Sequence, residues 1–316
     1  MIYDASKCGL NESLWVATFW TPTIDNVLDC ATATSWYGDV DAGEMFLNYT
    51  LDPKIRSYAG VDVTELSDRE NSSPGKTMWE RWNRCAMGLK PSPFICTRSF
   101  AWVLEIIKGD RLSLLNPFRW DKVIVNCPGK VNYDPTMPRL FKWDSATQVI
   151  ASDCKTYVDD LRTIGASEQG ARRATHLIET GLTYLGEQDS TRKRRPESQQ
   201  PGAWSGSISL SIPNQGLYVK VSMEKWIRAQ NIVRDLLSYF DESRKELPRL
   251  NTKSLERGVG FLVHLSMTYP VIIPFLRGLY LTMNSCRPQR DAHGWKMSKR
   301  AWASYQESCE AELGNG

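Results

Sequence analysis

Three aspartates in two parts of the chain could together hold divalent cations. Asp159 and Asp160 are adjacent within residues 149–165 (VIASDCKTYVDDLRTIG), where two short apolar runs flank them. This pattern predicts two strands joined by a tight turn. Two neighbouring carboxylates repel each other, and a divalent cation is the usual counter-charge. An acidic pair at a turn is alternatively only a solvated surface turn. The rest of the chain must therefore supply the other half of a site.

Residues 39–49 (DVDAGEMFLNY) offer the missing acidic group. Residues 35–38 predict the start of a short strand, which an acidic residue ends. Asp41 is followed five positions later by the aromatic residue Phe46. Asp39 competes with Asp41 for the same role, and Phe46 is alternatively a core residue.

A second polar segment, residues 88–94 (GLKPSPF), precedes a run with helical apolar spacing at residues 94–107. Gly88 allows close approach of the backbone to a ligand. The Ser92-Pro93 pair suits the first turn of a helix. Taken alone, this segment is an ordinary helix start.

The remaining segments predict the elements around these groups. Residues 67–76 are polar and contain a Pro-Gly pair, which predicts a loop or the tip of a hairpin. Residues 111–148 are rich in Pro, Asn and Asp, which predicts an irregular insertion. Residues 167–185 predict a helix that opens with a Ser-Glu cap. The sequence then contains a basic run at residues 192–195, a glycine-turned hairpin at residues 204–221, and helical patterns from residue 222 to residue 283.

The composition narrows the class of protein. The 316 residues are 41% hydrophobic and 24% charged, which argues against wholesale disorder. The net charge is only +3, so any nucleic-acid binding must depend on local clustering. The eight cysteines contain no CxxC pair, which argues against structural zinc and fits a reducing compartment. We expect a cytoplasmic or nuclear protein that is neither secreted nor membrane-bound.

Four segments together resemble the palm motifs of reverse transcriptases, the RNA-directed DNA polymerases. They are GDVDAGEMFLNYTLD, MGLKPSPF, TYVDDLRTIG and YLGEQDSTRKRRP, and they look like those of LTR- or DIRS-type retrotransposons. The resemblance implies that Asp41, Asp159 and Asp160 are catalytic and bind two Mg²⁺ (or Mn²⁺) ions. The spacing to Phe46 favours Asp41 over Asp39 for this role.

The same resemblance implies a set of substrate-binding residues. Phe46 would lie beneath the sugar of the nucleotide and exclude a 2′-hydroxyl. A residue of the basic run would lie near the pyrophosphate leaving group. The substrate-binding residues implied in this way are Phe46, Gly88, Lys90, Ser92, Tyr157 and Lys193.

The resemblance also implies the architecture. We expect an α+β fold, with a reverse-transcriptase-like palm made of an antiparallel sheet and packed helices, followed by a helical thumb. Residues 1–215 would form the palm with partial fingers, residues 216–290 the end of the primer-grip hairpin and the thumb, and residues 291–316 a polar tail. Only 40 residues precede Asp41, and Lys7 is the one basic residue among them, so we expect fingers that are largely missing by N-terminal truncation.

The implied activity is the two-metal transfer of deoxynucleotides from dNTPs to the 3′-hydroxyl of a primer. The partners would be an RNA or DNA template with its primer, dNTPs, and other domains of a retroelement polyprotein. The alternative is a catalytically inactive retroelement remnant that keeps the palm and thumb folds and binds nucleic acid weakly if at all.

Overall fold

A computed structural model of the chain describes residue 5 and residues 9–64, 77–187, 190, 194–212, 215–238 and 252–285. The chain divides into two compact units. One comprises Met1–Ser205 and Ser209–Tyr218, and the other comprises Gly206–Ile208 and Val219–Gly316. The predicted loop at residues 67–76 and the predicted polar tail at residues 291–316 lie outside the described residues.

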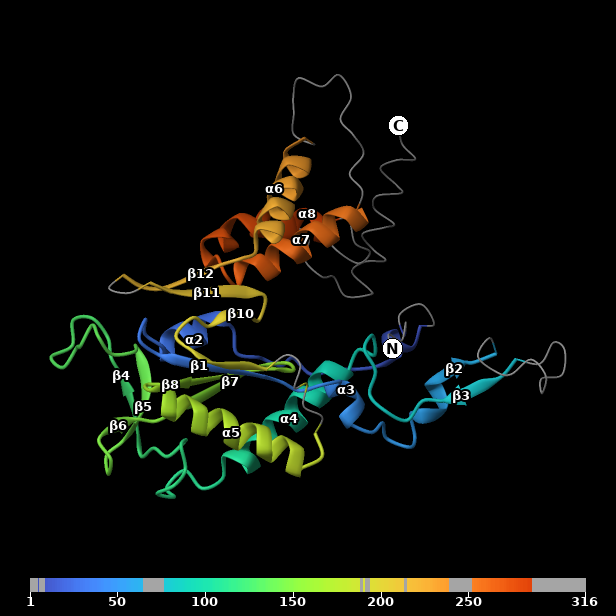
Figure 1. Cartoon of the computed structure of the whole chain (residues 1–316). Coiled ribbons are helices and arrows are strands. Elements are labelled where there is room, and N and C mark those ends of the chain that lie inside the picture. The colour runs from blue at the N-terminus through green and yellow to red at the C-terminus, as the bar shows by residue number, and fades with distance from the viewer. Residues whose placement is uncertain are drawn as a thin grey trace, which may run out of the picture. The chain divides into compact units, whose positions relative to one another are not determined.

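A four-stranded antiparallel sheet forms the centre of the first unit (Figure 1). Its order is β7-β8-β1-β9, and its strands are β1 (Trp36–Asp41), β7 (Asp153–Tyr157), β8 (Asp160–Gly165) and β9 (Arg195–Ser198). The predicted strand, turn and strand around the acidic pair are therefore confirmed as β7 and β8. Strand β1 pairs with β8 on one side and with β9 on the other.

Two long helices pack beside this sheet, α4 (Ser92–Lys108) and α5 (Glu168–Tyr184). The predicted cap of α5 is confirmed, because the backbone N–H of Gly170 donates a hydrogen bond to the Ser167 hydroxyl at 3.1 Å. Pro93 lies in the first turn of α4, where its missing N–H costs nothing. Figure 1 shows both helices on the same side of the sheet.

The ladder of β1 and β8 has two chemically different faces. Successive side chains of a strand point to opposite faces. The register places Val40 opposite Leu161 and Asp39 opposite Arg162. Val40 is 2% exposed and Leu161 is 0% exposed, and both belong to the apolar core that is formed with residues of α4 and α5. The face that carries Asp39 and Arg162 therefore points away from the helices.

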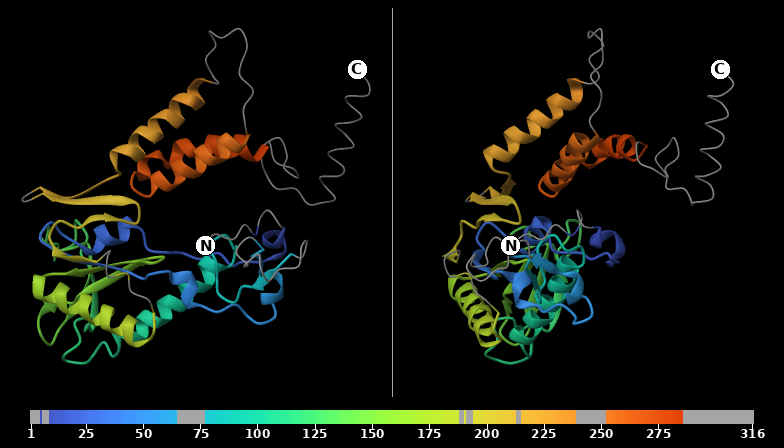
Figure 2. Two further views of the ribbon diagram at one scale, coloured as in Figure 1. Left: turned by 45° about the vertical axis from the view of Figure 1, so that its right-hand side comes forward. Right: turned by 90° about the vertical axis from the view of Figure 1, so that its right-hand side faces the viewer.

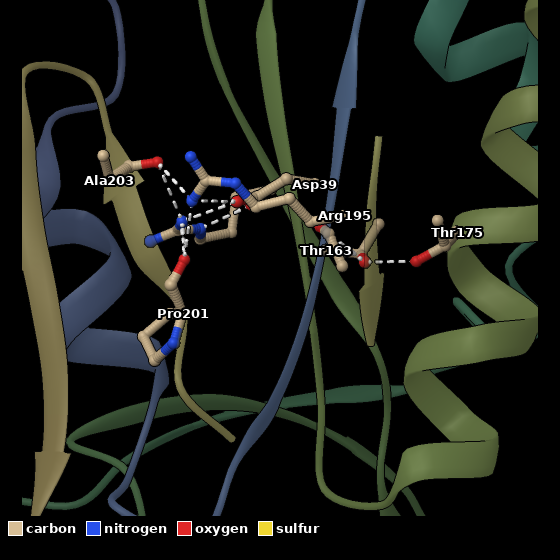
Figure 3. A network of polar contacts seen from close by, with 8 residues as sticks. Asp39, Thr163, Thr175, Arg195, Pro201 and Ala203 are labelled. Carbon is tan, nitrogen blue, oxygen red and sulfur yellow. Dashed lines mark hydrogen bonds and ion pairs between the residues drawn. The ribbon is translucent and has the colours of Figure 1, made fainter. Parts of the chain in front are cut away.

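Gly38 allows α5 to approach β1 closely. A Cβ atom at this position would clash with Oγ1 of Thr175 on α5 and would lie 2.9 Å from Oγ1 of Thr163 on β8. The two threonine hydroxyls are hydrogen-bonded to each other at 2.7 Å beneath the glycine (Figure 3). This contact fixes the helix against the two strands that carry the acidic residues.

The prediction of an irregular insertion at residues 111–148 is wrong in part. The chain forms a three-stranded antiparallel sheet there, with strands β4 (Lys122–Val125), β5 (Leu140–Asp144) and β6 (Val149–Ile150). The short apolar runs of β4 and β5 are typical of strands, but Pro, Asn and Asp residues surround them and dominate the composition. The apolar run predicted from residue 149 is correspondingly split between β6 and β7.

Smaller elements complete the first unit. They are α1 (Leu10–Ser13), α2 (Ile24–Cys30), α3 (Met45–Asn48), the 3-10 helix η1 (Arg56–Tyr58), β2 (Gly60–Asp62) and β3 (Trp79–Arg81). Strands β2 and β3 pair with each other as a separate antiparallel sheet. Another sheet has the order β10-β11-β12, with strands β10 (Gly202–Trp204), β11 (Ser207–Ile212) and β12 (Gly216–Lys220). The glycine-turned hairpin predicted at residues 204–221 is thus confirmed. Residues 207–208 of β11 and 219–220 of β12 belong to the second unit.

The described part of the second unit is mainly helical (Figure 2). Its helices are α6 (Met223–Ser238), α7 (Thr252–Ser266), the 3-10 helix η3 (Pro270–Ile272) and α8 (Ile273–Ser285), as the sequence predicts. Its apolar core includes Val221, Ala229, Leu262, Leu265 and Leu276. Among the described residues, no helix has the length and apolar character needed to cross a membrane.

Candidate active site

The structure brings the three predicted acidic residues together at one end of the central sheet. Asp41 is the last residue of β1 and lies opposite Asp160, the first residue of β8. The backbone N–H of Ala42 donates a hydrogen bond to the carbonyl oxygen of Asp159 at 2.9 Å. Residues far apart in the sequence are therefore neighbours through backbone pairing at the end of β1.

The turn that carries Asp159 is sharp and strained. Tyr157 pairs with Asp160, so only Val158 and Asp159 connect β7 to β8. Val158 has a φ of 55°, a left-handed conformation that is rare for a β-branched residue. Its side chain packs against the apolar core, which holds the residue in place. Backbone strain of this kind persists where the surrounding structure fixes it, and it is common at functional sites.

Tyr157 lies beside the acidic pair. Burial raises the pKa of its phenol above the ordinary value, and the negative charges of Asp160 and Asp159 raise that pKa further. Its ring contacts the ring of Trp204 edge to face, with 6.3 Å between the centroids. Tyr157 therefore stays protonated and is held between the acidic residues and β10.

The structure separates the roles of Asp39 and Asp41, which the sequence left open. Arg162 binds Asp39 with two short contacts, Nε to Oδ1 at 2.7 Å and Nη2 to Oδ2 at 2.8 Å. Arg162 is fully buried and also donates a hydrogen bond to the carbonyl oxygen of Pro201 at 2.6 Å. Asp39 thus balances a buried charge. Asp41 ends the strand beside Asp160 instead.

A cavity of about 390 Å³ opens at this end of the sheet. It combines acidic residues from β1 and β8 with two arginines and an aromatic side chain. Its lining consists of Asp39, Val40, Asp41, Asp160, Leu161, Arg194, Arg195, Ala203 and Trp204. The cavity is polar and carries both signs of charge, as expected of a site for a charged ligand.

The acidic residues suit Mg²⁺ by their chemistry. Magnesium prefers oxygen ligands and is usually held by one or two carboxylates together with substrate phosphates, not by a cage made only of protein. Among the described residues, no three His, Cys, Asp or Glu side chains lie close enough together to form a metal site, so Asp41, Asp159 and Asp160 are not preassembled as a set of ligands. Asp41 and Asp160 offer paired carboxylates at the cavity, and a phosphate-bearing ligand would complete the coordination.

Phe46 and the loop before α4 occupy other parts of the first unit. Phe46 lies in the short helix α3, which directly follows the acidic end of β1, and its side chain packs against the core while remaining partly exposed. Gly88 has a φ of 93°, which only glycine adopts readily. Its carbonyl oxygen accepts a hydrogen bond from the Asn11 side chain at 2.8 Å.

Two other predicted residues are not presented to the cavity. The Lys90 Nζ donates a hydrogen bond to the carbonyl oxygen of Leu14 at 2.8 Å, which ties it to the N-terminal segment. Ser92 is completely buried, so its hydroxyl has no direct access to a ligand in this state. Lys193 lies outside the described residues.

The sequence motifs do not point to Arg162, Arg195 or Trp204. A usable signal existed for Arg162, since an arginine inside an otherwise apolar strand needs a buried acidic partner. No such signal existed for Arg195 or Trp204, because β9 and β10 approach the site only through tertiary pairing. Arg195 and Trp204 line the cavity together with Asp41 and Asp160. Arg162 does not line it and is the buried partner of Asp39.

No protein-family model matches the chain, and neither does any curated protein sequence. Among solved structures, the chain is similar to a foamy viral protease–reverse transcriptase in complex with double-stranded DNA. The TM-score is 0.49 and the sequence identity 11%, over 91% of this chain and 37% of the viral chain. The chain thus spans little more than a third of that protein. Its function has to be argued from its own residues.

Proposed function

We propose that this chain is the RNA-directed DNA polymerase domain of an LTR- or DIRS-like retrotransposon. The observation that supports this best is the meeting of Asp41 with Asp159 and Asp160 through the β1–β8 register and the Ala42 backbone bond. These residues come from two motifs that resemble those of reverse transcriptases. Their substrates would be dNTPs and a primer on an RNA or DNA template.

The proposed reaction is nucleotidyl transfer to the primer 3′-hydroxyl. Two Mg²⁺ or Mn²⁺ ions, when bound, would activate that hydroxyl and neutralise the charge on the triphosphate and leaving pyrophosphate. Asp41 and Asp159 would hold both ions, and Asp160 would support them. Little covalent chemistry then falls to the protein, whose task is to position the reactants and stabilise charge.

Other residues of the first unit would bind and select the nucleotide. Phe46, which follows Asp41 on α3, would contact the sugar and exclude a 2′-hydroxyl. Tyr157 would support the acidic turn from β7. Gly88, Lys90 and Ser92 would shape the template and nucleotide side through the loop before α4, and Lys193 would lie near the pyrophosphate.

Primer extension on an RNA template tests the proposal, with dNTPs or NTPs and with Mg²⁺ or Mn²⁺. We expect extension with dNTPs only, lost in Asp159→Asn. The matched control is Asp29→Asn, because Asp29 forms only an exposed ion pair with Arg139 at 3.3 Å. Phe46→Ala should admit ribonucleotides. Extension that persists in Asp159→Asn would refute the site.

The absence of extension by wild-type protein, shown to be folded by its cooperative unfolding, would instead indicate an inactive remnant. Binding to a primer–template duplex distinguishes the remaining outcomes. Phosphate contacts make such binding fall steeply with salt. Negligible affinity at low salt would reject both nucleic-acid functions.

A further inference from the structure

The cavity contains an arginine, Arg195, whose positive charge its ion-pair partner neutralises only in part. Asp39 is shared by two arginines, Arg162 and Arg195 (Figure 3). Arg162 takes both carboxylate oxygens at 2.7 and 2.8 Å, whereas Nη1 of Arg195 lies 3.6 Å from Oδ2. One carboxylate cannot neutralise two guanidinium groups, so this network carries one surplus positive charge.

The surplus charge belongs to Arg195. The Arg162 side chain is fully buried, whereas the Arg195 side chain is 49% exposed and lines the cavity beside Asp41 and Asp160. Losing the distant contact with Arg195 would leave Asp39 fully paired with Arg162. Arg195 can therefore turn to a ligand without leaving a buried charge unpaired, which is the costly event in such networks.

Arg195 is anchored through a single nitrogen atom. Nη1 makes all of its side-chain polar contacts within the described part of the chain: to Asp39 and to the carbonyl oxygens of Ala203 at 3.2 Å and Pro201 at 3.4 Å. Nε and Nη2 remain for a ligand. A guanidinium edge with two N–H groups matches two oxygens of a phosphate, and this paired geometry is what distinguishes arginine from lysine.

We propose that Arg195 is a phosphate-binding residue of this cavity, anchored through Nη1 to the carbonyl oxygens of Pro201 and Ala203 while Arg162 neutralises Asp39. The proposal rests on the proposed function, because Asp41 and Asp160 would repel a phosphate unless divalent cations are bound with it. Arg195 would then bind phosphate oxygens in the cavity that it shares with Asp41 and Asp160.

Calorimetric titration with dTTP and Mg²⁺, without primer or template, tests the proposal with no turnover. Arg195→Gln should weaken dTTP binding about 10- to 100-fold, as expected when hydrogen bonds to a charged group are lost. Arg195→Lys keeps the charge but not the paired N–H groups and should give an intermediate loss. Arg139→Gln removes an exposed arginine that pairs with Asp29 and does not line the cavity, and it should bind as wild type does. Thermal unfolding verifies that each variant is folded.

A second titration identifies the source of the phosphate. If Arg195 contacts the nucleic-acid backbone instead, Arg195→Gln should bind dTTP normally and should bind a primer–template duplex more weakly, with a salt slope reduced by about one. Unchanged affinity for both ligands in a folded Arg195→Gln variant would overturn the proposal, as would a wild-type protein that binds neither.

Primer extension separates this inference from the proposed function. If the wild-type protein extends no primer but Arg195→Gln binds dTTP more weakly than wild type, the polymerase function is refuted and the phosphate site is retained. If the wild-type protein does extend primers but Arg195→Gln binds dTTP normally, the polymerase function is retained and the role of Arg195 in dTTP binding is refuted.

Discussion

Two neighbouring residue pairs of the β1–β8 ladder carry acidic side chains on the same face of the sheet, yet they differ in character. In the first, Asp39 faces the buried guanidinium of Arg162. In the second, two residues later on β1 and two residues earlier on β8, Asp41 faces Asp160. Opposite charges stabilise a cross-strand pair and like charges destabilise it. The first pair serves the fold, and the second is a cost that the proposed cation-binding site would explain.

These two pairs show why the role of an acidic residue cannot be assigned from its neighbours in the sequence. Asp39 and Asp41 stand two positions apart in the sequence, on one strand and one face. Their difference arises entirely from the residue that β8 places opposite each of them. A one-residue slip in register would exchange every side chain between the two faces of the sheet, and both pairs would be lost.

The largest effect should come from breaking the first pair. Asp39→Ala leaves Arg162 buried without its carboxylate, which we expect to lower the free energy of unfolding by about 3–5 kcal/mol. Chemical denaturation measures the change. Asp29→Ala is the matched control, since its exposed ion pair with Arg139 should be worth about 0–1 kcal/mol.

A double variant makes this prediction stricter. Asp39→Asn combined with Arg162→Gln removes both charges and keeps polar groups on both strands. We expect it to be more stable than Asp39→Ala alone. If the double variant is no more stable than Asp39→Ala, the buried unpaired charge of Arg162 is not the cause of the destabilisation.

Breaking the second pair should affect activity and spare the fold. We expect Asp41→Asn to lower the rate of primer extension more than about 100-fold. Loss of a residue that only supports a metal ligand costs about 10- to 100-fold, and loss of a ligand should cost more. The free energy of unfolding of this variant should change by no more than about 1 kcal/mol, the scale of a cross-strand pair. Destabilisation as large as that of Asp39→Ala, with extension retained, would reverse our assignment of the two residues.

An intermediate effect is expected at the far end of β7, where Asp153 meets two lysines. Lys142 and Lys155 lie 2.9 and 2.7 Å from its oxygens. Burial alone would raise the pKa of Asp153, but the two ammonium groups outweigh it and lower that pKa to about 2. Since the folded-state pKa is depressed, the stabilisation is present above about pH 4 and is lost as the pH falls toward 2.

Denaturation of wild-type protein and Asp153→Asn across this pH range measures the effect. The variant should be less stable by about 2 kcal/mol at neutral pH, and the difference should shrink below pH 4. A difference that is independent of pH would mean that Asp153 contributes through packing and not through its charge.

The smallest effect is expected in the second unit, at His264. Burial lowers the pKa of its imidazole, and the nearby Lys225 lowers it further, with Nζ 3.5 Å from Nε2. The neutral form is therefore favoured in the folded state, so stability should be complete above about pH 6.5 and decline slightly as the pH falls below it. His264→Gln should remove this decline. An identical pH profile in both proteins would exclude His264 as its source.

Local sequence patterns predict most elements of the fold. The helices at residues 92–108 and 168–184, the described α-helices α6, α7 and α8 and the β7–β8 hairpin all follow from apolar periodicity, caps and turns. The strands at residues 122–125 and 140–144 escape prediction because each is short and surrounded by turn-forming residues. Strand propensity over four or five residues is weak and depends on the strands beside it.

The sequence by itself determined that an acidic residue ends the strand near residue 41 and that an acidic pair, Asp159 and Asp160, lies at a tight turn between two later strands. It also places Arg162 two positions after Asp160. Only the tertiary structure decided that Asp39 is paired with Arg162, that Asp41 faces Asp160, and that Arg195 enters the same cavity from β9. The physical reason is that strand register and sheet order are set by long-range backbone pairing and by which face packs on α4 and α5. The charge opposite each aspartate depends on these features.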